Sequence, residues 1–259
     1  MAKRMPNKCI YCQGTGMTKE HYWNRWSKKY QIVSYKSHIH NKELQDERVS
    51  IKKDGNQLDH SIRKVCKACN TGWLRNVGER AEPVIKHLIE NRPTHLTNEE
   101  KLHLATWITT FSMSWEYKDI KTKATPQWER DFIAKNQNPP LTWHIFLSIS
   151  DNSWCSQTMH AFAAAGDENK KPIGDVQVTT FGLNCLLFHA FSTRLPIDPF
   201  FHKSVSDQGP ISIWPPNSFT LQPISWGKRA TKVEAEDLHF ETFNMAFSVR
   251  NKTDWTRFS

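Results

Sequence analysis

Two pairs of cysteines constrain the fold of this chain more than any other feature of its sequence. Cys9 and Cys12 form one Cys-x2-Cys pair, and Cys66 and Cys69 form a second pair after an interval of 53 residues. Each pair places two thiolates on one tight turn, and two such turns complete the tetrahedral set of sulfurs that structural zinc prefers. The alternative is two unrelated pairs of redox-active or free thiols. We therefore expect a zinc site that joins segments far apart in the sequence.

The rest of the chain predicts an α+β fold. The turn at 54–56 (Asp-Gly-Asn) lies between extended segments at 48–53 and 57–65 and predicts a β-hairpin. A helix, uneven or broken at its glycines and proline, is expected from Lys67 towards Ile89, and a capping-box signature at 97–100 opens a second helix. The expected elements further along are helices at 97–118, 126–136 and 234–247 and antiparallel strands at 143–150, 154–163, 176–191 and 211–214, with another extended segment earlier, at 31–40. Cys155 and Cys185 fall in two of these strands, where we expect them to be small core residues.

The positive charge of the chain lies in its first 75 residues. These hold 16 Lys and Arg against 6 Asp and Glu, whereas the remaining 184 residues hold 19 against 20. A solvated basic face would explain this excess. Its concentration on the segment that carries the cysteines favours a polyanionic partner, of which DNA or RNA is the simplest.

Residues around the cysteines resemble those of the HNH endonuclease superfamily. Glu20-His21 follows the first cysteine pair, Asn70 directly follows Cys69, and the run 65–74 (VCKACNTGWL) is similar to a group of bacterial and phage proteins labelled HNH endonucleases. The architecture resembles the branch in which a four-cysteine zinc holds the ββα-metal core, as in phage junction-resolving endonucleases. This resemblance implies a treble-clef HNH finger over residues 1–92, followed by a helical and then β-rich accessory region over residues 93–259.

The resemblance also implies a metal-dependent hydrolysis of phosphodiester bonds. His21 would be the general base that removes a proton from water, and Glu20 and Asn70 would hold a catalytic Mg²⁺ or Mn²⁺. The four cysteines would hold a purely structural zinc. One helical turn after Asn70 the chain has Leu74, so the third ligand of the family has no direct counterpart, and Asn76 and Glu79 are the substitutes.

Several alternatives stay open from the sequence alone. Asp59-His60 is a second acidic-histidine pair, but it lies so close to Cys66 that we favour Glu20-His21. The aromatic and basic strip at 23–30 is equally compatible with base stacking and with packing on the finger. A non-catalytic zinc module that binds nucleic acid or a protein is the competing function. The residues expected to contact nucleic acid, DNA more than RNA, are Arg25, Lys28, Lys29, Lys64, Lys67 and Arg75.

The location and partners follow from simpler features. The chain has no apolar stretch long enough to cross a membrane, and its basic N-terminus lacks the apolar segment of a secretory signal, so we expect a cytoplasmic protein. Residues 93–259 would choose the target, form a homo-oligomer or bind a regulatory partner. A role in a phage or in antiphage defence fits small HNH proteins of this kind.

Overall fold

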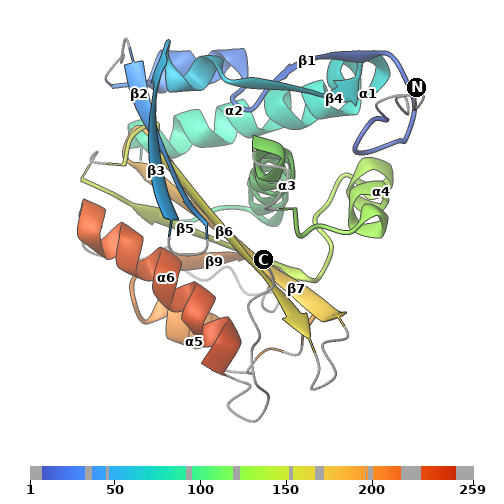
Figure 1. Ribbon diagram of the computed structural model, residues 1–259. Coiled ribbons are helices and arrows are strands. Elements are labelled where there is room, and N and C mark those ends of the chain that lie inside the picture. The colour runs from blue at the N-terminus through green and yellow to red at the C-terminus, as the bar shows by residue number, and fades with distance from the viewer. Residues whose placement is uncertain are drawn as a thin grey trace.

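The computed structural model of the protein combines helices with antiparallel strands, which confirms the predicted α+β class (Figure 1). It describes residues 8–32, 37–44, 47–91, 95–118, 123–151, 154–166, 172–195, 197, 201–216 and 229–248. Among these residues, no helix is long and apolar enough to cross a membrane.

The cysteine-bearing segment folds into two paired strands and the helices that follow them. β1 (Met17–His21) pairs antiparallel with β4 (Ser61–Cys66), and β4 leads directly into α1 (Lys67–Thr71) and α2 (Trp73–Asn91). The predicted break between the two helices lies at Gly72, where a Cβ would come 2.5 Å from the Ala68 carbonyl oxygen. Pro83, by contrast, lies inside α2 without ending it.

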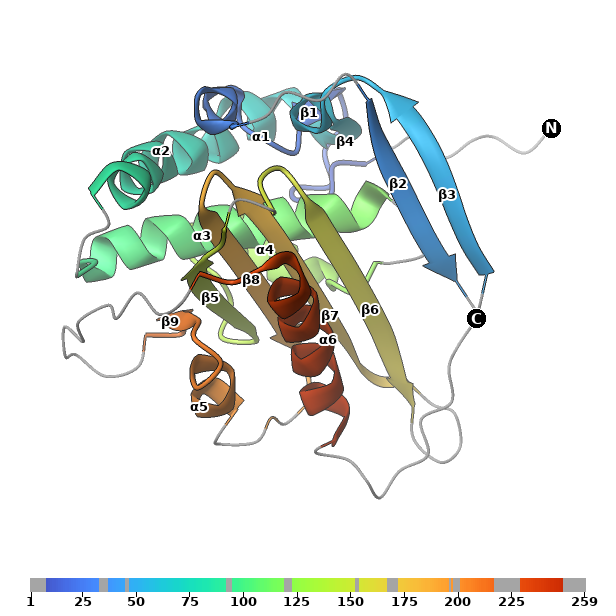
Figure 2. The same ribbon diagram turned by 90° about the vertical axis from the view of Figure 1, so that its left-hand side faces the viewer.

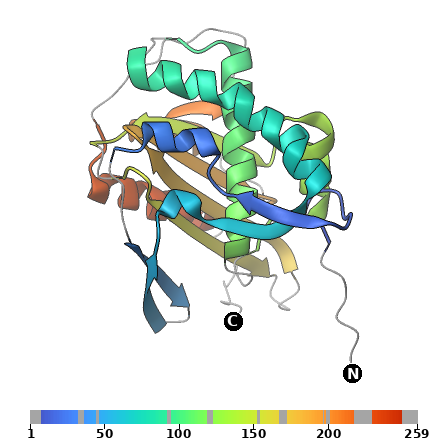
Figure 3. The ribbon, with the colours of Figure 1, turned by 90° about the horizontal axis from the view of Figure 1, so that it is seen from above.

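The segment between β1 and β4 corrects one prediction. β2 (Ser37–Leu44) pairs with β3 (Glu47–Asp54) in a separate two-stranded ribbon, seen in Figures 2 and 3. The expected hairpin of 48–53 with 57–65 is therefore wrong. Gly55 does adopt the positive φ of a turn (98°), but Asn56 then caps a short 3-10 helix, η2 (Gln57–Asp59), by accepting the Leu58 N–H at 2.9 Å. Another 3-10 helix, η1 (Arg25–Tyr30), precedes the ribbon, and residues 33–36 of the predicted segment 31–40 lie outside the described residues.

The helices after residue 96 agree with their predictions. α3 (Asn98–Trp115) begins at Thr97 with a complete capping box, in which the Thr97 hydroxyl accepts the Glu100 N–H and the Glu100 carboxylate accepts the Thr97 N–H. A 3-10 turn, η3 (Glu116–Lys118), ends it, and α4 (Gln127–Asn136) follows after Pro126.

The later strands form one antiparallel sheet in the order β6-β7-β8-β5-β9. The expected strand at 176–191 is two strands, because Asn184 adopts a φ of 57° and turns the chain back on itself. The bounds of the five strands are Trp143–Ile149 (β5), Thr158–Gly166 (β6), Pro172–Leu183 (β7), Leu186–Thr193 (β8) and Ile211–Trp214 (β9).

Helices cover both faces of this sheet (Figure 2). α3 and the cysteine-bearing segment lie on one face, and α5 (Phe201–Ser206) and α6 (Lys232–Ser248) lie on the other. The core on the α3 side is continuous with the cysteine-bearing segment, since Trp23 packs edge-on against Phe111 of α3 and Phe181 of β7 at ring distances of 4.7 and 5.5 Å. The site described next is thus positioned by elements from both halves of the chain.

Candidate functional site

The four cysteines of the two pairs meet at one point. The sulfur atoms of Cys9, Cys12, Cys66 and Cys69 all lie within 4.8 Å of one another, and none of the four forms a disulfide. A zinc ion with four sulfur ligands at about 2.3 Å would hold them about 3.8 Å apart. Four thiols at this spacing therefore could hold a tetrahedral metal ion such as zinc, and the predicted clustering of the four cysteines is confirmed.

Backbone hydrogen bonds shape the first cysteine turn. The Cys9 N–H donates to the Gly14 carbonyl at 2.9 Å, and the Gln13 N–H returns to the Cys9 carbonyl at 3.0 Å, with Gln13 at a φ of 57°. Gly14 lies against the site, because a Cβ there would come 3.3 Å from the Cys12 sulfur. The turn is attached to β4 by the Ile10 N–H, which donates to the Lys64 carbonyl at 2.9 Å.

Backbone amides also point at the sulfurs. The Cys66 N–H donates to the Cys9 sulfur at 3.3 Å, and the Cys69 N–H, at the start of α1, donates to the Cys66 sulfur at 3.5 Å. Burial raises the pKa of the Cys12 and Cys69 thiols. Burial disfavours the charged thiolate. A bound cation would offset this cost, because metal binding displaces the thiol protons.

Glu20 and Asn70 come together beside this centre. The Asn70 Nδ2 donates to Thr18 Oγ1 at 3.0 Å and to the Lys19 carbonyl at 3.2 Å, across a bulge in β1. A carbonyl only accepts hydrogen bonds, so the Asn70 amide nitrogen, and not its oxygen, must face the Lys19 carbonyl. Burial raises the pKa of Glu20 to about 7, and the nearby Asn70 amide opposes this shift.

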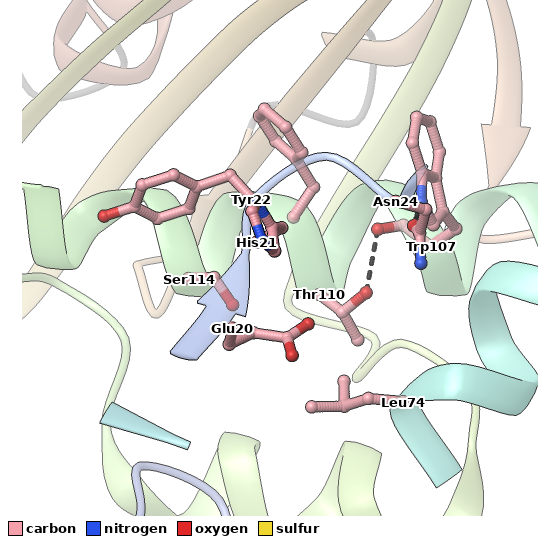
Figure 4. A pocket seen from close by; sticks show the side chains of 9 residues that line it. Glu20, His21, Tyr22, Asn24, Leu74, Trp107, Thr110 and Ser114 are labelled. Carbon is pink, nitrogen blue, oxygen red and sulfur yellow. Dashed lines mark hydrogen bonds between the residues drawn. The ribbon is translucent and has the colours of Figure 1, made fainter. Parts of the chain in front are cut away.

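A small pocket lies where β1 meets α3 (Figure 4). The Glu20 carboxylate points into it, towards Thr110 of α3 and Leu74 of α2. The remaining lining residues are His21, Tyr22, Asn24, Trp107, Phe111 and Ser114. Since four of the nine belong to α3, the region after residue 92 contributes a wall of the pocket.

His21 lies at the end of β1, half-buried, among charged groups. Burial lowers the pKa of His21, as do the cations of Lys19, Arg25 and Lys28, whereas Asp59 acts in the opposite direction. The Tyr22 N–H donates to the His60 carbonyl at 3.0 Å, so the two acidic-histidine pairs are neighbours. Asp59 and His60 lie in and just after η2 and not on a strand.

The six basic residues expected at a nucleic-acid surface differ in their surroundings. Three form exposed ion pairs: Lys28 with Asp59 at 2.5 Å, Lys29 with Glu82 at 2.8 Å and Arg75 with Glu79 at 2.7 Å. Arg25 and Lys67 are exposed and Lys64 is half-buried on β4. Within the same strip the tryptophans Trp23 and Trp26 are buried in the core, so packing accounts for the aromatic residues there.

Sequence reasoning missed the aromatic residues that enclose the cysteines. Tyr11 is buried between the two cysteines of the first pair, and its ring meets Trp73 edge-on at 5.0 Å. The Tyr11 hydroxyl lies 3.3 Å from the Thr110 carbonyl oxygen and 3.2 Å from the Ser114 hydroxyl. The available signal was their spacing, since Tyr11 directly precedes Cys12 and Trp73 follows Cys69 by four residues.

Comparisons of the chain with protein-family models, with curated proteins and with solved structures give no match.

Proposed function

We propose that this protein is a metal-dependent endonuclease of the HNH type, with residues 1–92 as its ββα-metal finger. The observation that carries the proposal is the contact between the Glu20 carboxylate of β1 and the Asn70 amide of α1, beside the cluster of four cysteines. A carboxylate and an amide oxygen are ligands that Mg²⁺ and Mn²⁺ accept.

Each residue of the site has a task in this proposal. Glu20 and Asn70 hold the divalent ion, which would stabilise negative charge on the scissile phosphate. His21, at the end of the same strand, takes the proton from the attacking water. Arg25 and Lys28, which lie near His21, attract the phosphate backbone. The zinc held by the cysteines takes no part in the reaction, and its role is to hold β1 against α1.

One observation favours the competing function, a non-catalytic zinc module that binds nucleic acid or a protein. Leu74, Trp107 and Phe111 make one side of the pocket apolar, and Leu74 occupies the place where a third ligand would be expected. A divalent ion there would depend on two protein ligands and on water. Such a module would bind nucleic acid in a salt-sensitive manner and release no product.

A cleavage assay separates the two functions. Purified wild type, His21→Ala and His87→Ala are incubated with supercoiled plasmid, single-stranded DNA and RNA in Mg²⁺, Mn²⁺ or EDTA. His87 is an exposed residue of α2 and provides the matched control. We expect cleavage by wild type and by His87→Ala, lost in EDTA and lost in His21→Ala while zinc content is retained.

Two results of this assay would contradict parts of the proposal. If wild type shifts labelled nucleic acid in a gel but cuts none of the three substrates in either ion, the binding module is the correct function. If His21→Ala still cuts, His21 is not the general base. The substrate that is cut will decide between DNA, which we favour, and RNA.

Three further expectations remain part of this proposal. The cytoplasm is the expected location, since zinc-thiolate centres persist where thiols stay reduced. The region after residue 92 would choose the target, form a homo-oligomer or bind a regulatory partner. A role in a phage or in antiphage defence is the biological setting we propose.

A further inference from the structure

The indole N–H of Trp73 is a buried hydrogen-bond donor in an unusual position. Trp73 is the first residue of α2, and its indole Nε1 is buried. No atom among the described residues accepts the hydrogen of this group within hydrogen-bond geometry. Leaving a buried donor without an acceptor costs about 1–3 kcal/mol, so native structures usually provide a partner.

The partner that the geometry offers is the Cys69 sulfur. Trp73 follows Cys69 by four residues, and the break at Gly72 turns the chain between them. Tyr11 holds the indole from the other side through its edge-on ring contact at 5.0 Å. The indole group is near enough to the Cys69 sulfur for the two side chains to interact.

We propose that Trp73 is a positioning residue of the metal centre, and that its indole N–H donates a hydrogen bond to the Cys69 sulfur when a metal ion holds that sulfur as a thiolate. A thiol is a weak acceptor, whereas a thiolate is charged and binds an N–H more strongly. The bond withdraws electron density from one sulfur of the four and fixes its direction. Groups that hold metal ligands in this way change metal affinity about 10- to 100-fold when they are removed.

The break at Gly72 is part of this arrangement. A Cβ at this position would come 2.5 Å from the Ala68 carbonyl oxygen, so only glycine permits the turn that separates α1 from α2. The metal-binding residue Cys69 and the donor Trp73 can therefore approach from two helices that are not collinear. This role is independent of whether the neighbouring pocket cleaves nucleic acid.

Trp26 offers a matched control. Its indole Nε1 is also buried without an acceptor among the described residues. Its ring packs on Trp107 and Tyr30, at 5.6 and 6.0 Å. Replacing either tryptophan by phenylalanine keeps an aromatic ring and removes an N–H, but only one of the two N–H groups adjoins a metal ligand.

The experiment compares wild type, Trp73→Phe and Trp26→Phe loaded with Co²⁺ or Zn²⁺. We expect Trp73→Phe to shift the sulfur-to-cobalt charge-transfer absorption and to bind Zn²⁺ about 10- to 100-fold more weakly in competition with a chelator. Trp26→Phe should change neither quantity. An unshifted band with unchanged affinity in Trp73→Phe, or equal losses in both variants, would overturn the proposal.

A measurement on the unmutated protein covers the case in which Trp73→Phe does not fold. The protein is loaded with an NMR-active cadmium isotope and its tryptophans are labelled with nitrogen-15. A hydrogen bond to a metal-bound sulfur transmits a scalar coupling from cadmium to the bonded proton. We expect this coupling at the Trp73 indole proton, and its absence there would overturn the proposal.

Discussion

Acid should destabilise the layer in which α6 covers the sheet, because that layer buries neutral histidines. His189 of β8 and His239 of α6 both bond the Thr180 hydroxyl through Nδ1 at 2.8 Å. The other nitrogen of His189 bonds the Thr242 hydroxyl of α6 at 2.9 Å. His144 of β5 lies in the same layer, facing α5.

The direction of the effect follows from the two states of each ring. Burial lowers the pKa of His189 and of His144 to about 3, and it lowers the pKa of His239 well below the usual value. In the unfolded chain these rings take up protons near a pH of about 6.5. The unfolded state therefore binds more protons as the pH falls from about 6.5 towards 3, and the free energy of unfolding decreases through that window.

The magnitude is large enough to measure. Each buried histidine lowers the free energy of unfolding by about 1.4 kcal/mol per pH unit below its unfolded pKa. Between a pH of about 7.5 and one of about 5 the loss is about 2 kcal/mol per histidine, or about 6 kcal/mol for three. Glu20 acts with the opposite sign, because burial raises its pKa to about 7, and it offsets part of this loss. The total stability of a domain is only about 5–15 kcal/mol.

Urea unfolding across this pH range tests the reasoning in three proteins: wild type, His189→Asn and His87→Asn. The asparagine at 189 keeps a polar side chain but cannot take up a proton. We expect this variant to start less stable at neutral pH and then to lose about 2 kcal/mol less than wild type on acidification. Glu20 is present in all three proteins, so its contribution cancels in the comparison. Exposed His87 should leave the wild-type slope unchanged, and an equally steep slope in His189→Asn would refute the reasoning.

Three further substitutions test separate features of the fold. Arg130→Met should cost about 3–5 kcal/mol in urea unfolding, because it leaves Glu116 as an unpaired buried charge. The matching double variant with Glu116→Gln should recover part of that loss, and no recovery would contradict a pair interaction. Gly72→Ala should weaken Zn²⁺ binding in a chelator competition, since its Cβ would meet the Ala68 carbonyl oxygen; unchanged affinity would show that the break between α1 and α2 tolerates a side chain. Thr97→Ala should lower stability by about 1 kcal/mol through loss of the capping box of α3, with Thr97→Ser as the control that retains it.

Local signals made part of this structure predictable. The two cysteine pairs specify a tetrahedral sulfur site whatever lies between them, and the four sulfurs do meet. The start of α3 was predictable because a capping box needs only residues 97–100. Asn70 directly follows a cysteine of the cluster, and its amide contacts Thr18 of β1.

Strand pairing was not predictable in the same way. The turn signal at 54–56 is local and correct for Gly55, but it does not say which strand β3 pairs with. β1 and β4 pair across an interval in which a complete ribbon forms, and contacts between residues distant in sequence decide that outcome. The contribution of α3 to the pocket could not be predicted for the same reason. Thr110 and Ser114 approach Glu20 only through the packing of α3 against β1.

The base of the β2-β3 ribbon marks a place where the chain can accept insertions and deletions. Gln31 and Asn56 exchange two side-chain hydrogen bonds, at 3.1 and 2.7 Å, just outside the ribbon. His21 and Ser61 are partners where β1 ends and β4 begins, so the chain leaves the β1-β4 pair and returns to it at one place. Doubling the length of a loop costs only about 0.6 kcal/mol of closure entropy. Residues 32–55 thus occupy a natural insertion point, where a lineage can lengthen, shorten or exchange a segment while the four cysteines stay together.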